Sequence, residues 1–136
     1  MTVLTELEKE VLEKLLNGKA PIFEILFQQY RYLSVTKREM TGVGFFTYFS
    51  IPKDVQCIPG EPSFLFGDVH ADLKGLEGGA GFLLTINKGY LYDLEGYCYD
   101  GAWPQAIEII RIYYDDNGKR DEAKVIQTFH MRNPIE

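Results

Sequence analysis

The residues after position 33 contain several strand-like runs, and no helical pattern of ten or more residues separates one run from the next. A parallel pair of strands needs a crossover of about a dozen residues, usually a helix, between its members, whereas antiparallel strands need only a short turn. The sequence therefore predicts a mainly antiparallel sheet, with about five or six strands.

Before position 33 the apolar period is that of helices. In residues 3–16 apolar side chains recur at steps of three and four, charged side chains occupy the other side, and Asn17-Gly18 ends the pattern. Pro21 suits the first turn of a second helix, which carries an apolar stripe through Leu26. We expect this second helix to be the more buried of the two.

Length and composition indicate one globular domain. The chain has 136 residues, of which 46% are hydrophobic and 25% charged, enough to bury a core but too few for two ordinary domains. We expect an α+β domain over residues 1–136, helical over 3–33 and built around a sheet over 35–130. The two N-terminal helices are expected to pack on one face of that sheet.

The predicted strands are runs of β-branched and aromatic residues. They span residues 42–51, an alternating segment at 68–73, and residues 81–86, 90–99, 106–114 and 122–129. In the first run, alternation places four apolar side chains on one side: Val43, Phe45, Phe49 and Ile51. Asn87-Lys88-Gly89 is predicted to be a three-residue hairpin loop, because its glycine supplies a left-handed conformation, and Asp116-Asn117-Gly118 a further turn.

The acidic charge balance limits the classes of partner. The net charge is −6, and the sequence has no lysine- or arginine-rich run, so its surface repels a phosphate backbone on average. We therefore expect no nucleic-acid binding, and a basic protein is the better-matched partner. No motif calls for a cofactor.

The N-terminus and the cysteines indicate a cytoplasmic setting. Charges interrupt MTVLTELEKEVLEKLL every second or third position, so the segment is neither a signal-peptide apolar region nor a membrane span. Cys57 and Cys98 have no paired metal spacing, and two thiols do not make a disulfide framework. We expect a reduced environment and no membrane association.

Residues 64–79, FLFGDVHADLKGLEGG, resemble the first metal-binding block of calcineurin-like metallophosphoesterases, in which a strand ends in G-D-x-H. Asp68 and His70 are the matching positions. The family's later G-D-x-x-D-R-G and G-N-H-E blocks are missing, and only Tyr92-Asp93-Leu94-Glu95-Gly96 and His130 follow. Because a two-metal hydrolytic site needs more ligands than these, we reject this family.

A single metal site remains an alternative. Alternation places Asp68, His70 and Asp72 on one side of a strand, with neighbouring backbones roughly 6.5–7 Å apart, a separation that two side chains can bridge around one ion. The protein would then be a small metal-binding protein or hydrolase. The simpler interpretation, which we favour, is a half-buried strand whose polar side faces water.

No other catalytic arrangement is complete. Cys98 is expected to be a small buried side chain, and no serine lies in a G-x-S-x-G turn. Asp93 and Glu95 share one side of their strand and could share proton transfer, although a solvent-facing position explains them more simply. The glycines of residues 75–81 indicate a flexible turn between strands rather than a phosphate loop, because a strand follows them.

Aromatic side chains are concentrated in residues 90–103. Tyrosine and tryptophan offer a large rigid area with a polar tip, so they suit binding surfaces as well as half-buried sheet positions. Because both sides of the strand 90–99 carry aromatics, one set is expected to contact something other than the helices: a ligand, a second layer or another chain. The candidate partner-binding residues are Tyr90, Tyr92, Tyr97, Tyr99 and Trp103.

Residues 79–107 carry a glycine-phenylalanine strand, a glycine hairpin, Leu-Glu-Gly-Tyr and then Trp-Pro. This pattern resembles the C-terminal part of small bacterial proteins without an established activity, some of which resemble immunity proteins from toxin loci. The resemblance implies a biological context and no mechanism.

Together these features favour a non-enzymatic cytoplasmic protein that binds another protein. We expect an immunity-type inhibitor whose acidic, tyrosine-bearing sheet face covers a basic partner. A metal-binding protein centred on Asp68, His70 and Asp72 is the alternative. A homodimer formed through the aromatic face is a third possibility.

Overall fold

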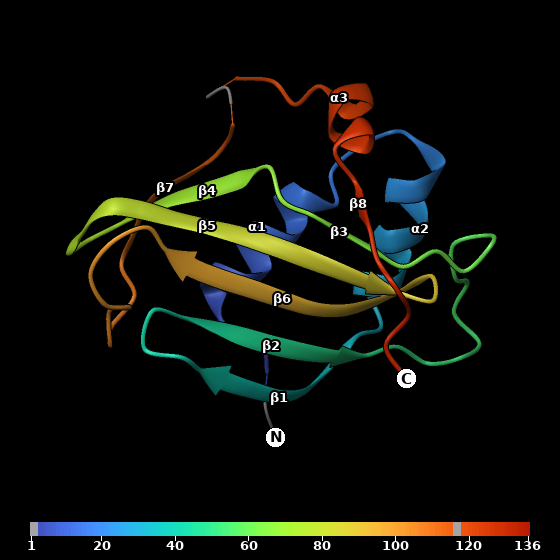
Figure 1. Ribbon diagram of the computed structural model, residues 1–136, viewed down its shortest axis with the longest axis horizontal. Helices are drawn as coiled ribbons and strands as arrows, with labels where there is room; N and C mark the ends of the chain where they lie inside the picture. Colours follow the sequence, from blue (N-terminus) through green and yellow to red (C-terminus); the bar gives the residue numbers. More distant parts are fainter. Residues whose placement is uncertain (1–2, 116–117) are drawn as a thin grey trace.

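The computed structural model describes residues 3–115 and 118–136. In these residues the chain forms three helices and a single sheet of eight strands, and Figure 1 shows α1 behind the long central strands. The helices are α1 (Glu6–Leu15), α2 (Pro21–Tyr30) and α3 (Glu122–Gln127). The strands are β1 (Ser34–Met40), β2 (Gly44–Ser50), β3 (Phe64–Phe66), β4 (Val69–Leu73), β5 (Leu76–Asn87), β6 (Tyr90–Cys98), β7 (Ile109–Tyr114) and β8 (His130–Met131).

All strand pairs are antiparallel, as the lack of crossover helices predicted. The order across the sheet is β1-β2-β6-β5-β3-β8, while β4 pairs with both β5 and β7. The 12-residue β5 is long enough to pair with β3 near one end and with β4 near the other. Beyond β5 the sheet therefore divides into two short parts, β3 with β8 and β4 with β7, which are visible in Figure 1.

Local sequence explains both N-terminal helices. Thr5 caps α1 by accepting a hydrogen bond from the Glu8 amide, and the Glu8 carboxylate accepts one from the Thr5 amide, which completes a capping box. Pro21 begins α2, where its missing N–H is no loss. Contacts join α1 to β4 and β7, and α2 to β6.

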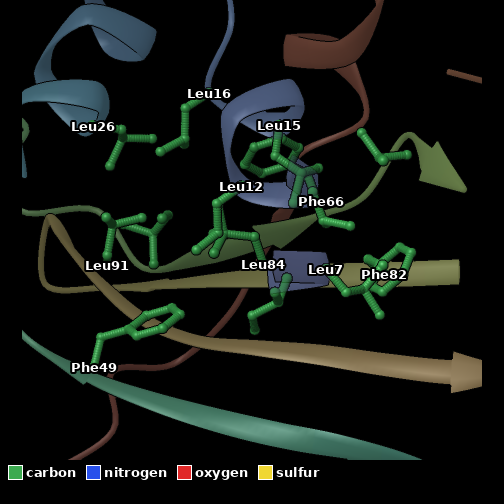
Figure 2. Packing of buried hydrophobic residues seen from close by; sticks show 14 of the residues in the cluster. Leu7, Leu12, Leu15, Leu16, Leu26, Phe49, Phe66, Phe82, Leu84 and Leu91 are labelled. Atoms are coloured by element: carbon green, nitrogen blue, oxygen red, sulfur yellow. The ribbon is translucent and has the colours of Figure 1, made fainter. Parts of the chain in front are cut away.

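The core forms where these helices meet alternating strand side chains. Figure 2 shows Leu12 and Leu26 from the helices near Leu84 and Leu91 from β5 and β6. All four are almost fully buried, and burial of one such side chain contributes about 1.5–3 kcal/mol. In the predicted strand 42–51, the side chains expected on one side are largely in this core, with Phe45, Phe49 and Ile51 buried and Val43 exposed.

The hairpin between β5 and β6 is present and tighter than predicted. Its loop is Lys88 and Gly89, both with positive φ, while Asn87 pairs with Tyr90 at the strand ends. A two-residue loop of this conformation matches the right-handed twist of the flanking strands. Glycine supplies one of the two left-handed positions without strain.

Several predicted elements are wrong. Residues 122–129, expected to be a strand, contain α3, and β8 follows it. The sheet has eight strands in the described residues instead of about five or six, because β1, β3 and β8 are present as well. Most of the predicted glycine turn belongs to β5, and only Gly75 lies before it with positive φ. The turn predicted at Asp116-Asn117-Gly118 includes residues outside the described ranges.

Candidate functional site

The strand register separates the sheet into two faces. Directly paired residues point to the same side, so Tyr48 of β2, Asp93 of β6 and Thr85 of β5 share a face opposite to the core. We call this surface the open face and define it by the residues that line its centre: Phe46, Tyr48, Leu83, Thr85, Asp93, Glu95 and Tyr97.

Two carboxylates lie at the centre of the open face. Asp93 lies between Tyr48 and Thr85 in the pairing strands, and Glu95 lies between Phe46 and Leu83. The aspartate is only 8% exposed, whereas the glutamate is half-buried. The prediction that both carboxylates face solvent is therefore wrong for Asp93, which is buried between the paired residues Tyr48 and Thr85.

The Asp93 carboxylate is incompletely paired. Its Oδ1 atom is buried and has no hydrogen-bond partner among the described residues. Burial raises the pKa of the Asp93 carboxyl, and the opposing effects of a hydrogen bond from Thr85 and of the Arg132 charge are smaller. Burial, and then the Asp93 charge, also raise the pKa of Glu95. A buried carboxylate that is only partly compensated is costly, so this feature requires an explanation beyond packing.

Aromatic rings flank these carboxylates. The ring of Phe46 stacks near that of Tyr48 with a centroid separation of 6.3 Å, and Tyr92 contacts Tyr48 edge-on at 6.0 Å. Lys37 lies 4.8 Å above the Tyr48 ring and pairs with Glu39 at 3.0 Å. The open face thus combines large rings with acidic groups, a composition that suits recognition of a cationic surface.

A second polar cluster continues this face toward β4 and β7. The Tyr99 hydroxyl lies 3.0 Å from Nδ1 of His70, and Asp115 pairs with the other ring nitrogen. Burial raises the pKa of Tyr99 to about 12, and Tyr97 adds to this effect. Tyr99 is therefore a poor source of phenolate, which argues against a role as an activated nucleophile. Both imidazole nitrogens already have partners.

The predicted metal ligands Asp68, His70 and Asp72 each pair with different side chains and share no partner. Asp68 accepts two hydrogen bonds from Arg120, at 2.8 and 2.9 Å. Asp72 accepts one from Arg111 at 2.7 Å. No group of three histidine, cysteine or acidic side chains in residues 3–115 and 118–136 is placed to hold a metal ion.

The structure divides the five predicted partner-binding residues. Tyr97 belongs to the open face, and two of the others adjoin it: Tyr92 contacts Tyr48, and Tyr99 contacts Tyr97 and His70. Tyr90 donates to the carbonyl oxygens of residues 53 and 55, so it anchors a loop. Trp103 packs on Phe45 on the core side, with a centroid separation of 5.4 Å.

Trp103 lines a groove instead. The groove lies between α1, β1 and the segment after β6, and its volume is about 320 Å³. Its lining includes Leu7, Met40, Phe45, Trp103 and Ile107, with the paired Glu8 and Arg38. It is separate from the open face.

Sequence reasoning missed Phe46 and Tyr48. The alternation of residues 42–51 contained the signal, since a strand with Phe45 and Phe49 in the core presents Phe46 and Tyr48 on its other side. The register that sets these rings against Glu95 and Asp93 had no such signal, because it depends on pairing between distant segments.

The helices of the described residues are too short or too polar to cross a membrane. Comparison with known proteins found no matching family model, no similar curated protein and no similar solved structure.

Proposed function

We propose that this chain is a protein-binding domain whose open face binds a basic protein partner. The observation that carries this proposal is Asp93, a carboxylate 8% exposed at the centre of a ring-lined sheet face, whose Oδ1 has no hydrogen-bond partner in residues 3–115 and 118–136. A partner that supplies positive charge adds to the partial compensation that Thr85 and Arg132 give this carboxylate.

The chemistry of the face supports binding rather than catalysis. The half-buried rings of Phe46, Tyr48 and Tyr97 provide rigid apolar area, as anchor residues of protein interfaces do. The concavities at Arg120 and at Trp103 are lined by other residues, so the open face lies outside them. A broad face with a charged centre matches a protein surface better than a small molecule.

An immunity-type inhibitor is the specific form of this proposal. The net charge of −6 attracts a basic enzyme over a distance and mainly increases the association rate. Anchoring rings such as Tyr97 then act on the dissociation rate. The acidic face covers the partner's basic site and so blocks its substrate.

The test begins with capture of partners from the native cell, with wild-type protein, Tyr97→Ala and the control Tyr32→Ala. Tyr32 is 54% exposed and follows α2, away from the open face. The captured protein is then purified and titrated by calorimetry. We expect 1:1 binding that Tyr97→Ala weakens at least about tenfold and Tyr32→Ala leaves unchanged.

Equal affinity of all three proteins would overturn the proposal. Light scattering gives the other decisive outcome: a doubled mass that Tyr97→Ala returns to that of the monomer assigns the face to a second copy of this chain. That result would also end the inhibitor proposal.

A further inference from the structure

The chain twice pairs a carboxylate with an arginine that lies over an aromatic ring. Arg120 binds Asp68 and lies 4.6 Å from the centroid of the Phe23 ring. Arg111 binds Asp72 at 2.7 Å and lies 4.2 Å from the centroid of the Tyr113 ring. In both arrangements the guanidinium binds a carboxylate and lies over an aromatic ring.

Asp93 has the carboxylate and the ring of this arrangement but lacks the arginine. Tyr48 lies directly opposite it in the register of β2 and β6, where paired Cβ atoms are about 4.5–5.5 Å apart. No ion pair joins Asp93 to a cation in the described part of the chain. Lys37, the cation over the Tyr48 ring, pairs with Glu39 instead.

Arg132 is the chain's own candidate for this position, and it does not fill it. Its charge lowers the pKa of Asp93 by less than burial raises it, and its side chain is exposed. The Arg132 amide donates to the carbonyl oxygen of Ser63, so the Arg132 backbone is held beside the residue that precedes β3. The carboxylate thus stays under-compensated with Arg132 present.

We infer that Asp93 and Glu95, framed by Phe46 and Tyr48, form a socket for one arginine side chain of a partner protein. The inference deepens the proposed function and rests on it. Glu95 is the more exposed carboxylate and pairs with the guanidinium first, and Asp93 supplies the buried charge. The rings provide a stacking surface for the guanidinium plane.

Arginine fits this socket better than lysine. The guanidinium is planar, weakly hydrated and presents a fork of donors that matches two carboxylate oxygens, whereas an ammonium group is compact and strongly hydrated. Entry into a site where Asp93 is 8% exposed removes water from the cation, which costs less for arginine. The other charged or titratable groups facing the socket are Lys37, Glu39, Tyr48, Tyr92 and Arg132.

A short peptide tests the socket without a known partner. The probe is acetyl-Gly-Arg-Gly-amide, compared with the same peptide carrying lysine or glutamine, and the measurement is the ¹³C shift of the side-chain carboxyl carbons by NMR. We expect saturable shifts at Asp93 and Glu95 with a dissociation constant on the order of millimolar, at least about threefold weaker for lysine and absent for glutamine.

Two variants of equal charge change make the test specific. Asp93→Asn is expected to weaken the arginine peptide at least about fivefold, whereas Glu10→Gln, an exposed residue of α1, leaves its affinity unchanged. Equal binding of the arginine and glutamine peptides, or equal effects of the two variants, would overturn the socket.

Arg132→Gln decides whether the chain fills its own socket. We expect this variant to bind the arginine peptide as tightly as the wild type or more tightly. Peptide binding that appears only in Arg132→Gln would assign the socket to Arg132 and overturn the inference.

The purified partner separates failure of the socket from failure of the proposed function. If Tyr97→Ala weakens the complex and Asp93→Asn does not, the open face binds the partner without the socket. If neither variant weakens the complex, the proposed function fails as well. The inference requires that both variants weaken it.

Discussion

At the scale of single residues, Asp93 is the position where the chain departs most clearly from good packing. Aspartate is disfavoured inside strands, and here it occupies the central position of three paired strands with Tyr48 and Thr85 at its sides. One of its oxygens has no partner in the described residues. Departures of this kind are typical of functional positions, where the requirements of function reduce the stability of the fold.

Replacement of this carboxyl group should stabilise the protein in a pH-dependent way. The pKa of Asp93 is raised in the folded state, so that state holds the proton more tightly than the unfolded chain does. Stability conferred by the protonated group is present below the unfolded pKa and is lost as the pH rises through the folded pKa. We therefore expect Asp93→Asn to be more stable than the wild type at pH 7, with a smaller difference near pH 4.

Urea unfolding at a series of pH values measures this difference. Glu10→Gln, on exposed helix surface, serves as the control and should show no comparable pH dependence. A wild-type protein that equals or exceeds Asp93→Asn in stability at pH 7 would contradict the assignment of a burial cost to this group.

The sequence allowed a partial description of this site. Strand alternation placed Asp93 and Glu95 on one side correctly, because both lie beyond the irregularity of the β5 and β6 pairing at residues 85–86. It placed Asp93 in solvent wrongly, because the burial of a strand residue depends on its neighbours in the strands alongside. Those neighbours come from residues 48 and 85, and a single strand holds no information about them.

At the scale of elements, one glutamine joins a helix to the central hairpin. Gln29 of α2 is fully buried, and its amide donates to the carbonyl oxygens of Gln56 and Gly89. Its side-chain oxygen accepts a hydrogen bond from the amide of Leu91, next to the irregular pairing of β5 and β6. The side chain thus satisfies backbone groups that the strand ladder leaves unpaired.

Gln29→Ala should therefore destabilise the fold strongly. The substitution removes these hydrogen bonds from the Leu91 amide and the Gln56 carbonyl, and the Gly89 carbonyl keeps only the bond from the Ile58 amide. We expect the free energy of unfolding to fall by roughly 2–4 kcal/mol. Gln28→Ala is the matched control, since Gln28 is the exposed neighbour in the same helix and should change stability by less than about 0.5 kcal/mol. Chemical denaturation of both variants gives the comparison, and equal losses would contradict the role of Gln29.

The elements that sequence reasoning identified wrongly have local explanations. In residues 122–129 the spacing of Val125, Ile126 and Phe129 also fits a helix, and Asp121 caps α3 by accepting from the Lys124 amide at 3.2 Å. β1 has the sequence SVTKREM, whose charges hide a strand because it lies at the sheet edge. Strong alternation of apolar and polar residues predicted β2 and β6. The weak alternation of β1 did not predict a strand.

At the scale of the whole molecule, residues of the C-terminal third form hydrogen bonds with the segment that connects the two N-terminal helices. Arg120 binds Asp68 and donates to the carbonyl oxygen of Asn17 at 2.7 Å, just after α1. Glu122 accepts from the amides of Lys19 and Ala20, at the start of α2. The contacts with residues 17, 19 and 20 join residues 102 or 103 positions apart, so no local pattern could have predicted them.

Arg120→Met tests how much stability this long-range connection supplies. The substitution leaves the Asp68 carboxylate, whose side chain is 9% exposed, without its cation, and we expect a loss of roughly 3–5 kcal/mol in the free energy of unfolding. Lys119→Met makes the same change of charge at an exposed neighbour and should cost less than about 0.5 kcal/mol.

The double variant Asp68→Leu with Arg120→Met identifies the cause of that loss. With both charges removed, the buried carboxylate no longer lacks a partner, and we expect the double variant to be more stable than Arg120→Met alone. Urea denaturation of the single and double variants measures the free energies of unfolding that this comparison needs. A double variant less stable than Arg120→Met would show that the guanidinium acts through its contacts with Phe23 and Asn17 instead of through Asp68.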